Sequence, residues 1–473
     1  MLYCTYTHTH VKTFPSASFT KMGIEKQVID FFKGMVSDAF SDTIPSGVTR
    51  VTVDMNASIR KLPPCKSMMK NVGDSVSAID YNYEMTREEL LERFCYFLKH
   101  LWNRYPNAQT FALVYDKKSP ALKKTEQVKR SVARKASHKK RNITETRFEG
   151  IRETTKFTVN ALMTASYVRR AETFRWLAEE SADHVVSLKL AEGRCITMIH
   201  DYAMGKPPII VNPSGCTEDT VSAWKNDVYE GEVACVMHAV TKWSKPARVN
   251  RTHNKGVTVT VRPPREVVAI ESIDTDTLVI IIMHLIKGNR DNPRTSTKRK
   301  HHETVSDETK DIVWVRSTKR TQASHVNVSM LARELQRMHP NSVYLKEALF
   351  LTSVICKNDF CPGIKRSLTN GVNARTIVEA IFNQCVGLVG TRSDPLRVDV
   401  DMVDLLTGVN PKIRKLTAQS HARTKKGMPT AAARRAETKH HATIECITEQ
   451  TKLIRGPLLY ALWDYWTTFK IAK

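Results

Sequence analysis

The sequence lacks long hydrophobic runs and paired cysteines, and each absence excludes a class of protein. No run approaches the length of a membrane span, since the apolar run Leu278 to Met283 is far too short. Residues 1 to 21 carry Thr and His where a signal peptide needs an apolar stretch. The ten cysteines form no Cys-x-x-Cys pair, and the closest two, Cys356 and Cys361, have no histidine nearby. We therefore expect no membrane span, no secretion signal and no structural zinc, and we expect a reducing compartment.

Acidic residues are few compared with basic ones. The 473 residues contain 48 Asp and Glu against 73 Lys and Arg, which gives a net charge of +25. Such a charge favours polyanionic partners, with nucleic acid first among them. The alternative is a neutral body with basic arms, because part of the charge lies in low-complexity stretches. Hydrophobic residues at 41% and aromatic residues at 7% suffice for a core, in one large domain or in a few ordinary ones.

Two predicted strands are each followed by an acidic residue. The alternating, β-branched segment Val48 to Val53 predicts a strand before Asp54, and the apolar run Phe111 to Tyr115 predicts a buried strand before Asp116. Between them, Thr86 and the glutamate three residues later form a capping box that opens an amphipathic helix. Strands that alternate with helices predict a parallel α/β sheet, whose ligands bind at the carboxyl edge. A single Asp after a strand, however, is more often only a turn residue.

A cationic segment follows the second of these acids. After Ser119-Pro120 the chain becomes basic and helix-prone, and its cations are Lys123, Lys124, Lys129, Arg130 and Arg134. An acid at a strand end beside a cationic helix suits a site that holds a metal cation with the acid and a polyanion with the helix. The alternative is a strand cap followed by a solvated basic helix.

A pair of glutamates occurs in the middle of the chain. Glu230 and Glu232 are separated by one glycine and are followed by small apolar residues that predict a helix. Two glutamates at a helix start can point their oxygens the same way, towards a cation. The pattern is weak by itself, and its value lies in its order among the other acids. Asp219 and Asp227 are nearby competitors for the same role.

A pair of aspartates follows, between two apolar runs. Val267–Ile270 and Leu278–Ile282 both predict buried strands, and Ser272, Asp274 and Asp276 stand between them. Acids two residues apart after a strand can converge on one metal cluster. The alternative is a polar turn between strands, although such a turn would not need two acids.

The C-terminal part predicts helices separated by basic segments. Residues 287 to 328 are polar and charged, which predicts a linker, and the run Lys298 to His302 within it is a weak nuclear-import pattern. Residues 343 to 355 return to a helical pattern. Residues 412 to 441 are basic and rich in Ala and Thr, and we expect them to be mobile. The apolar ending, Leu458 to Trp466, is expected to dock on the body.

Taken in order, these blocks resemble the flap endonuclease and XPG family of structure-specific nucleases, which have a PIN-like domain. Residues Asp116 to Arg134 fall in step with the family's N-terminal block without a gap, and Ser272 to Leu278 resembles its Ser-x-Asp-x-Asp-x-Leu signature. Met22-Gly23-Ile24 resembles the family's first residues, but 21 residues precede it here. A second departure is Gly371-Val372-Asn373, which stands where the family has Gly-Ile-Gly and weakens the expected grip on duplex.

The resemblance implies an α/β fold with a central, mostly parallel sheet flanked by helices, a helical arch and a C-terminal helical region. It also implies a site for two Mg²⁺ ions, for which Mn²⁺ can substitute, because such a pair needs several hard oxygen donors. The ligands carried over are Asp54, Asp116, Glu230, Glu232, Asp274, Asp276 and Asp359. Lys123 and Arg130 match the two basic residues that reach the scissile phosphate, where a cation can stabilise the transition state. The residues expected to contact nucleic acid are Lys124, Lys129, Arg134, Gly363 and Gly371.

The function implied by the resemblance is Mg²⁺-dependent endonucleolytic cleavage of DNA at flaps and other single-strand/duplex junctions, in replication, repair or recombination. The expected partners are DNA and replication proteins, no membrane is expected, and the expected location is the nucleus. The large inserts and the altered duplex motif are most similar to divergent members encoded by large DNA viruses. Two alternatives stay open. One is an RNA-cleaving nuclease of the host-shutoff type with the same acids, and the other is a non-catalytic nucleic-acid-binding protein on the same fold.

Composition and resemblance together divide the chain into regions. We expect an N-terminal extension (1–21), a first nuclease region with the start of the arch (22–150), a second nuclease region (151–286), a basic linker (287–328), a helical duplex-binding region (329–411), a basic flexible segment (412–441) and a C-terminal helix (442–473).

Overall fold

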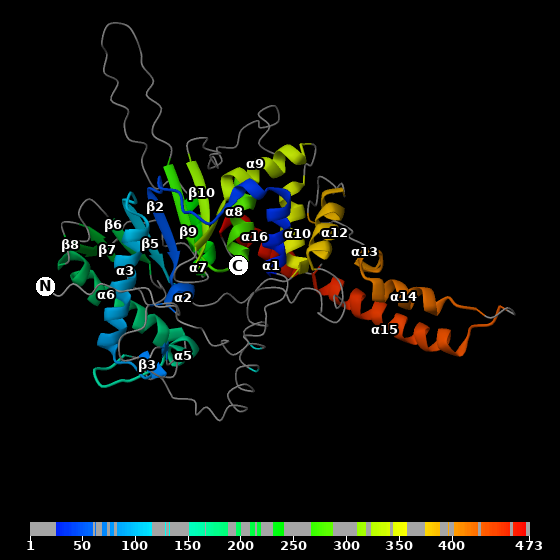
Figure 1. The fold of residues 1–473 in the computed structure, drawn as a ribbon, viewed down its shortest axis with the longest axis horizontal. Helices are drawn as coiled ribbons and strands as arrows, with labels where there is room; N and C mark the ends of the chain where they lie inside the picture. The colour runs from blue at the N-terminus through cyan, green and yellow to red at the C-terminus, as the bar shows by residue number, and fades with distance from the viewer. Residues whose placement is uncertain are drawn as a thin grey trace, which may run out of the picture.

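A computed structural model gives the fold as a central sheet with helices on both faces, from which one pair of helices extends outward (Figure 1). In the residues that it describes, no helix combines the length and the apolar character that crossing a membrane requires. The described residues are 25–59, 62, 69–72, 76–79, 83–115, 128, 132, 151–165, 167–187, 195–199, 209–212, 215–218, 230–240, 266–286, 310–317, 323–340, 344–356, 374–387, 396, 402–423, 427–454 and 457–469.

The main sheet has nine strands and is mostly parallel. Its strands are β1 (Phe40–Ser41), β2 (Arg50–Asp54), β5 (Thr110–Val114), β6 (Cys195–Ile199), β7 (Ile209–Asn212), β8 (Gly215–Glu218), β9 (Glu266–Glu271), β10 (Lys310–Ser317) and β11 (Ala323–Asn327). Their order is β1-β11-β10-β9-β2-β5-β6-β7-β8. The five central strands, β10 to β6 in that order, run parallel, and the two strands at each edge pair antiparallel. The predicted α/β class is therefore confirmed. A separate hairpin consists of β3 (Met69–Val72) and β4 (Val76–Ile79).

Helices pack on both faces of the sheet, and the sheet separates two hydrophobic cores. One core lies under α3 (Arg87–Arg104) and α6 (Tyr167–Ser187), and it includes Val51 and Val53 of β2. The other core is built by α1 (Glu25–Met35), α7 (Gly231–Val240), α8 (Thr275–Leu285), α9 (Val328–Met338), α10 (Leu345–Cys356) and α12 (Ala374–Gly387). Successive strand residues point to opposite faces, so Asp54 faces this second group of helices.

Shorter and C-terminal helices complete the described structure. They are the 3-10 helix η1 (Ser37–Ala39), α2 (Met55–Ser58), α5 (Val159–Thr164), α13 (Met402–Val409), α14 (Pro411–Ser420), α15 (Ala431–Ile454) and α16 (Pro457–Thr468).

The capping box at the start of α3 forms as the sequence predicts. The Glu89 backbone N–H donates to the Thr86 hydroxyl at 3.3 Å, and the Thr86 N–H donates to the Glu89 carboxylate at 2.9 Å. Two backbone donors that an α-helix leaves unsatisfied are thus paired reciprocally. The capping box thus fixes the residue at which α3 begins, and α3 leads into β5.

The run Leu278–Ile282 is helical, and the prediction of a strand there was wrong. It lies inside α8, whose residues from Thr275 to Met283 are all buried. A helix enclosed on every side is apolar all round, so it loses the 3.6-residue pattern that separates helix from strand in a sequence. The pair Asp274 and Asp276 therefore stands between a strand and a helix.

Two basic regions are more ordered than their composition suggested. The predicted linker 287–328 contains β10 and β11, and β10 pairs parallel with β9 through a buried run from Ile312 to Val315. The predicted flexible segment 412–441 contains α14 and the first part of α15. For the described parts of these two regions the predictions were wrong, because a few apolar residues are enough to pack a strand or a helix against its neighbours.

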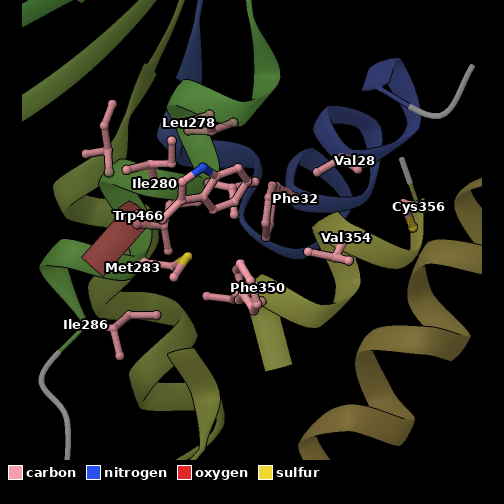
Figure 2. Close-up of a cluster of buried hydrophobic side chains, with 14 of the residues drawn as sticks. Val28, Phe32, Leu278, Ile280, Met283, Ile286, Phe350, Val354, Cys356 and Trp466 are labelled. Carbon is pink, nitrogen blue, oxygen red and sulfur yellow. The ribbon is translucent and has the colours of Figure 1, made fainter. Parts of the chain in front are cut away.

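The C-terminal helix docks on the body, as the sequence predicts. Trp466 of α16 is fully buried, and its ring meets Phe350 of α10 edge-on at 5.6 Å between centroids. Figure 2 shows Trp466 inserted among side chains of α1, α8 and α10, including Phe32 and Met283. The His284 ring stacks on Phe469 at 4.5 Å, and its Nε2–H donates to the Trp466 carbonyl at 2.7 Å. The ring thus links α8 to the end of α16.

His284 should make the stability of the protein depend on pH. Burial lowers its pKa to about 4, and the nearby charge of Lys346 acts in the same direction. The unfolded chain takes up a proton near pH 6.5, whereas the folded chain resists it until about pH 4, so stability is lost as the pH falls between these values. We expect a loss of about 3 kcal/mol across this window. Urea unfolding at pH 7, 5.5 and 4.5 should show it.

The control for this experiment is the His284→Gln variant. A glutamine can still donate to the Trp466 carbonyl but does not titrate. Carboxylates titrate in both proteins, so the difference between the two curves isolates the histidine. Parallel curves from pH 7 to 4.5 would contradict the assignment.

Candidate active site

The carboxyl ends of β2 and β9 bring Asp54 and the aspartate pair Asp274 and Asp276 to one edge of the sheet. Asp54 is the last residue of β2, and it is opposite Val114 at the end of β5. On its other side, Val53 is opposite Glu271, the last residue of β9. The loop that carries Asp274 therefore starts at Ser272, level with Asp54 at the end of β2. The expected position of these acids at the carboxyl edge follows from this register.

Ser272 organises the loop that carries the aspartate pair. Its backbone N–H donates to the Val315 carbonyl of β10 at 3.2 Å, which fixes the loop to the sheet. Its hydroxyl oxygen accepts the Asp274 N–H at 3.2 Å and the Thr277 hydroxyl at 3.0 Å. These bonds explain why a serine stands two residues before the first aspartate. The loop is held by its own hydrogen bonds.

Asp274 is the N-cap of α8. Its carboxylate oxygen Oδ1 accepts the Asp276 N–H at 3.1 Å, and its backbone is extended. A carboxylate at a helix N-terminus is stabilised by the capping bond and by the helix dipole. Since a carboxylate offers about four lone-pair positions, capping is compatible with metal binding. Asp276, in the first turn, is 8% exposed.

The glutamate pair lies at the start of α7, on the face of the sheet to which Asp54 points. Glu230 is 4% exposed, and its carbonyl accepts the Ala234 N–H at 2.9 Å as the helix begins. Glu232 is half-buried in the first turn. The helix packs across β2, β5 and β9 and against α8. The prediction that these glutamates open a helix is confirmed.

The five described acids, Asp54, Glu230, Glu232, Asp274 and Asp276, are the kind of ligand that a hard divalent cation prefers. By themselves they do not form a complete metal site. All five donors are carboxylates, and Asp54, Glu230 and Asp276 are at most 8% exposed. Buried carboxylates require compensating positive charge, and Mg²⁺ prefers such oxygen ligands. Within the described part of the chain, no three His, Cys, Asp or Glu side chains come together as a metal-binding group. Asp116 and Asp359 lie outside the described residues, so the set of seven acids stays a prediction.

The predicted cations and glycines also lie outside the described residues. These are Lys123, Lys124, Lys129, Arg130, Arg134, Gly363 and Gly371. The nearest described residues in the sequence are Val128 and Val132, which are exposed, and Ala374, where α12 begins. On the other side of Asp116, Tyr115 stacks on Phe174 of α6 at 4.8 Å. The cationic gate and the duplex-binding motif therefore stay predictions.

A buried ionic cluster beneath the site was not found from the sequence. Glu271 is 4% exposed and accepts two hydrogen bonds, from Arg104 Nη1 at 2.8 Å and from the Tyr105 hydroxyl at 2.7 Å. Burial raises the pKa of Tyr105 well above its usual value, and the charge of Glu271 raises it further. Burial would lower the pKa of Arg104, but the Glu271 carboxylate outweighs it and raises that pKa. The only sign of this cluster in the sequence is Glu271 itself, an acidic residue at the end of an apolar run. Its partners, Arg104 and Tyr105, could not be recognised from the sequence.

This cluster fixes the end of β9 to the end of α3. Arg104 and Tyr105 close α3 on the opposite face of the sheet from α7 and α8. Glu271 immediately precedes Ser272, whose bonds hold the aspartate loop. The strand end is therefore tied on one face by an ion pair and continues on the other into the loop that carries the acids.

Comparisons with known proteins add little information about the function of this site. No family model matches the sequence, and no curated protein matches it. Among solved structures, the chain is similar to the catalytic core of Rad2 in complex with a DNA substrate, with 9% sequence identity and a TM-score of 0.38. The match covers 93% of this chain and 86% of that one. A TM-score this low reflects only a broad likeness of backbone, and the fold class rests on the sheet topology described above.

Proposed function

We propose that this protein is a Mg²⁺-dependent nuclease of the flap endonuclease type, which hydrolyses phosphodiester bonds at single-strand/duplex DNA junctions. The observation that carries the proposal is the placement of acids at the ends of neighbouring parallel strands. Asp54 ends β2, and the loop with Asp274 and Asp276 follows β9 beside it. Carboxylates placed along this edge, in a chain with a net charge of +25, suit a cation site that acts on a polyanion.

The residues divide into metal ligands and phosphate-binding cations. Asp54, Asp274 and Asp276, with the glutamates at the start of α7, would hold the metal, and Asp116 and Asp359 would complete the set. When bound, the metal supplies Lewis-acid stabilisation of the phosphate and lowers the pKa of a bound water. Lys123 and Arg130 would pair with phosphate oxygens and stabilise the charge that develops during cleavage. The burial of Asp54 and Asp276 would strengthen their interaction with the metal, because charges there are poorly screened.

Cleavage assays with matched substrates test this proposal directly. The purified chain is incubated with end-labelled flap DNA, with the same duplex without a flap and with single-stranded RNA, in Mg²⁺, Mn²⁺ or EDTA. We expect cleavage near the flap junction with either metal and none in EDTA. Cutting restricted to RNA would support the RNA-cleaving alternative. Binding without cutting of any substrate would support a non-catalytic protein, and either result would overturn the proposal.

Metal binding can be measured without any cleavage. Calorimetric titration of the DNA-free protein with Mg²⁺ should show binding that Asp54→Asn weakens. Heats that are unchanged in this variant would remove Asp54 from the ligand set.

A further inference from the structure

The two helices α14 and α15 form a hairpin that extends away from the sheet. Figure 1 shows them side by side at the far end of the molecule, beyond α13. They pack against each other, and α13 contacts both of them where the hairpin joins the body. This arrangement exposes most of the surface of the hairpin to solvent.

The sequence specifies both ends of this hairpin. Asn410 caps α14 by accepting the Lys412 N–H at 2.9 Å, and Pro411 occupies the first helical turn. Thr430 caps α15 by accepting the Ala433 N–H at 3.0 Å. The turn contains Gly427 at φ 77°, in the left-handed region that glycine adopts without steric cost. The hairpin is therefore a specified element of the fold.

The inner and outer surfaces of the hairpin differ sharply. Small or aliphatic side chains are buried between the helices, among them Ala433, Ala436 and Ile413. Over residues 411–423 and 427–448, only Glu437 and Glu445 supply exposed carboxylates. No salt bridge in this described range pairs its cations with a carboxylate. The seven exposed cations in the same range are Lys412, Arg414, Lys415, Arg423, Arg434, Arg435 and Lys439.

The residue types on this surface favour binding to the phosphate backbone of a duplex. Residues 411–454 contain no Phe, Trp or Tyr, so the hairpin offers no aromatic ring on which bases of a single strand could stack. All of its exposed cations except Arg423 stand on the two helices, whose regular geometry suits the regular spacing of phosphates in a duplex. The 24 residues of α15 span about 36 Å, close to one turn of B-form DNA at about 34 Å.

We propose that the α14–α15 hairpin binds the phosphate backbone of duplex DNA without reading its sequence. This inference deepens the proposed function, on which it rests for its role: the hairpin would hold the duplex arm of a junction while the acids at the sheet edge act on the strand to be cut. Binding of this kind releases counterions and therefore weakens steeply with salt.

The experiment compares duplex binding by two triple variants of the full chain. Lys415→Gln, Arg434→Gln and Lys439→Gln together remove three exposed charges from the hairpin, and none of these side chains makes a hydrogen bond or an ion pair with another described residue. Fluorescence anisotropy with a labelled duplex, in EDTA and over a series of salt concentrations, gives the affinity and its salt slope. We expect roughly tenfold weaker binding and a slope smaller by about 2 to 3, since each lost phosphate contact removes about 0.9.

The matched control removes the same charge from the body. Lys99→Gln on α3, with Arg152→Gln and Lys156→Gln ahead of α5, change exposed residues whose side chains also make no hydrogen bond or ion pair with another described residue, and this variant should bind duplex like the wild type. A hairpin variant with Lys415→Arg, Arg434→Lys and Lys439→Arg keeps the charge and should also bind normally, which excludes a folding defect. Equal weakening by both neutralised variants would overturn the inference. So would single-stranded DNA or duplex RNA that competes better than duplex DNA. Because EDTA prevents metal-dependent cleavage, failure of the nuclease proposal leaves this binding result unaffected.

Discussion

Replacing Asp54 by Asn is expected to lower the rate of flap cleavage on the order of 10³-fold while leaving DNA binding intact. Asparagine has nearly the same shape, so the 3% exposed site at the end of β2 keeps its packing and loses one charged metal ligand. A metal ion contributes several kcal/mol to stabilising charge in the transition state, and each 1.36 kcal/mol corresponds to a factor of ten in rate. Single-turnover cleavage and anisotropy binding, on the same labelled flap, separate the two effects.

Asp274 offers a sharper test, because it also caps α8. Asparagine is as good an N-cap as aspartate, so Asp274→Asn preserves the bond to the Asp276 N–H and removes only the charge. Alanine removes both, and it should cost about a further 1 kcal/mol of stability. If Asp274 is a metal ligand, both variants lose cleavage to a similar degree. If it is only a cap, Asp274→Asn remains fully active.

The control for both aspartates is an acid at the opposite edge of the sheet, where the central strands begin. Glu266 begins β9 and lies 3.5 Å from Arg50. Glu266→Gln removes one negative charge from the sheet without touching the carboxyl edge, and we expect cleavage to change by less than about threefold, in line with the small effects of charges at a distance. A large loss in this variant as well would mean that overall charge, and no particular site, governs the rate.

Local signals in the sequence were sufficient to locate the edge of the sheet. The alternation before Asp54 and the apolar run before Asp116 each predicted a strand, and both are neighbouring strands of one parallel sheet. The capping box at Thr86 predicted the start of α3 to the residue. These features depend on neighbours within a few positions, so they can be predicted without knowledge of the rest of the chain.

Features set by distant neighbours could not be predicted in this way. The helix α8 has an apolar sequence that equally suits a strand, and only its burial among α7, α9 and α10 decides between them. Likewise, β10 is a short apolar run in a charged region, and it becomes a strand because β9 offers it a parallel partner. The role of Glu271 depends on Arg104, which is 167 positions away in the sequence. Charge alone suggested disorder for the hairpin, although its caps are visible in the sequence.

Removal of the Glu271 carboxylate should produce a large loss of stability. Glu271→Ala leaves Arg104 and the buried Tyr105 hydroxyl without their shared acceptor, and breaking a buried pair in this way costs roughly 3 to 5 kcal/mol. Glu271→Gln keeps an oxygen for the Tyr105 hydroxyl and loses only the charge, so its loss should be smaller. The midpoint of urea unfolding, followed by tryptophan fluorescence, measures both.

The comparison with a surface pair isolates burial as the cause. Arg337 and Glu334 on α9 lie 2.7 Å apart, slightly closer than Arg104 and Glu271 at 2.8 Å, but their side chains are 74% and 34% exposed. Water screens such a pair, so Glu334→Ala should cost at most about 1 kcal/mol. If the two alanine variants lose equal stability, distance rather than burial sets the strength of these pairs, and the Glu271 cluster is no anchor for the loop that carries Asp274. A much larger loss at Glu271 means that the strand end beneath the acids is held from the opposite face of the sheet.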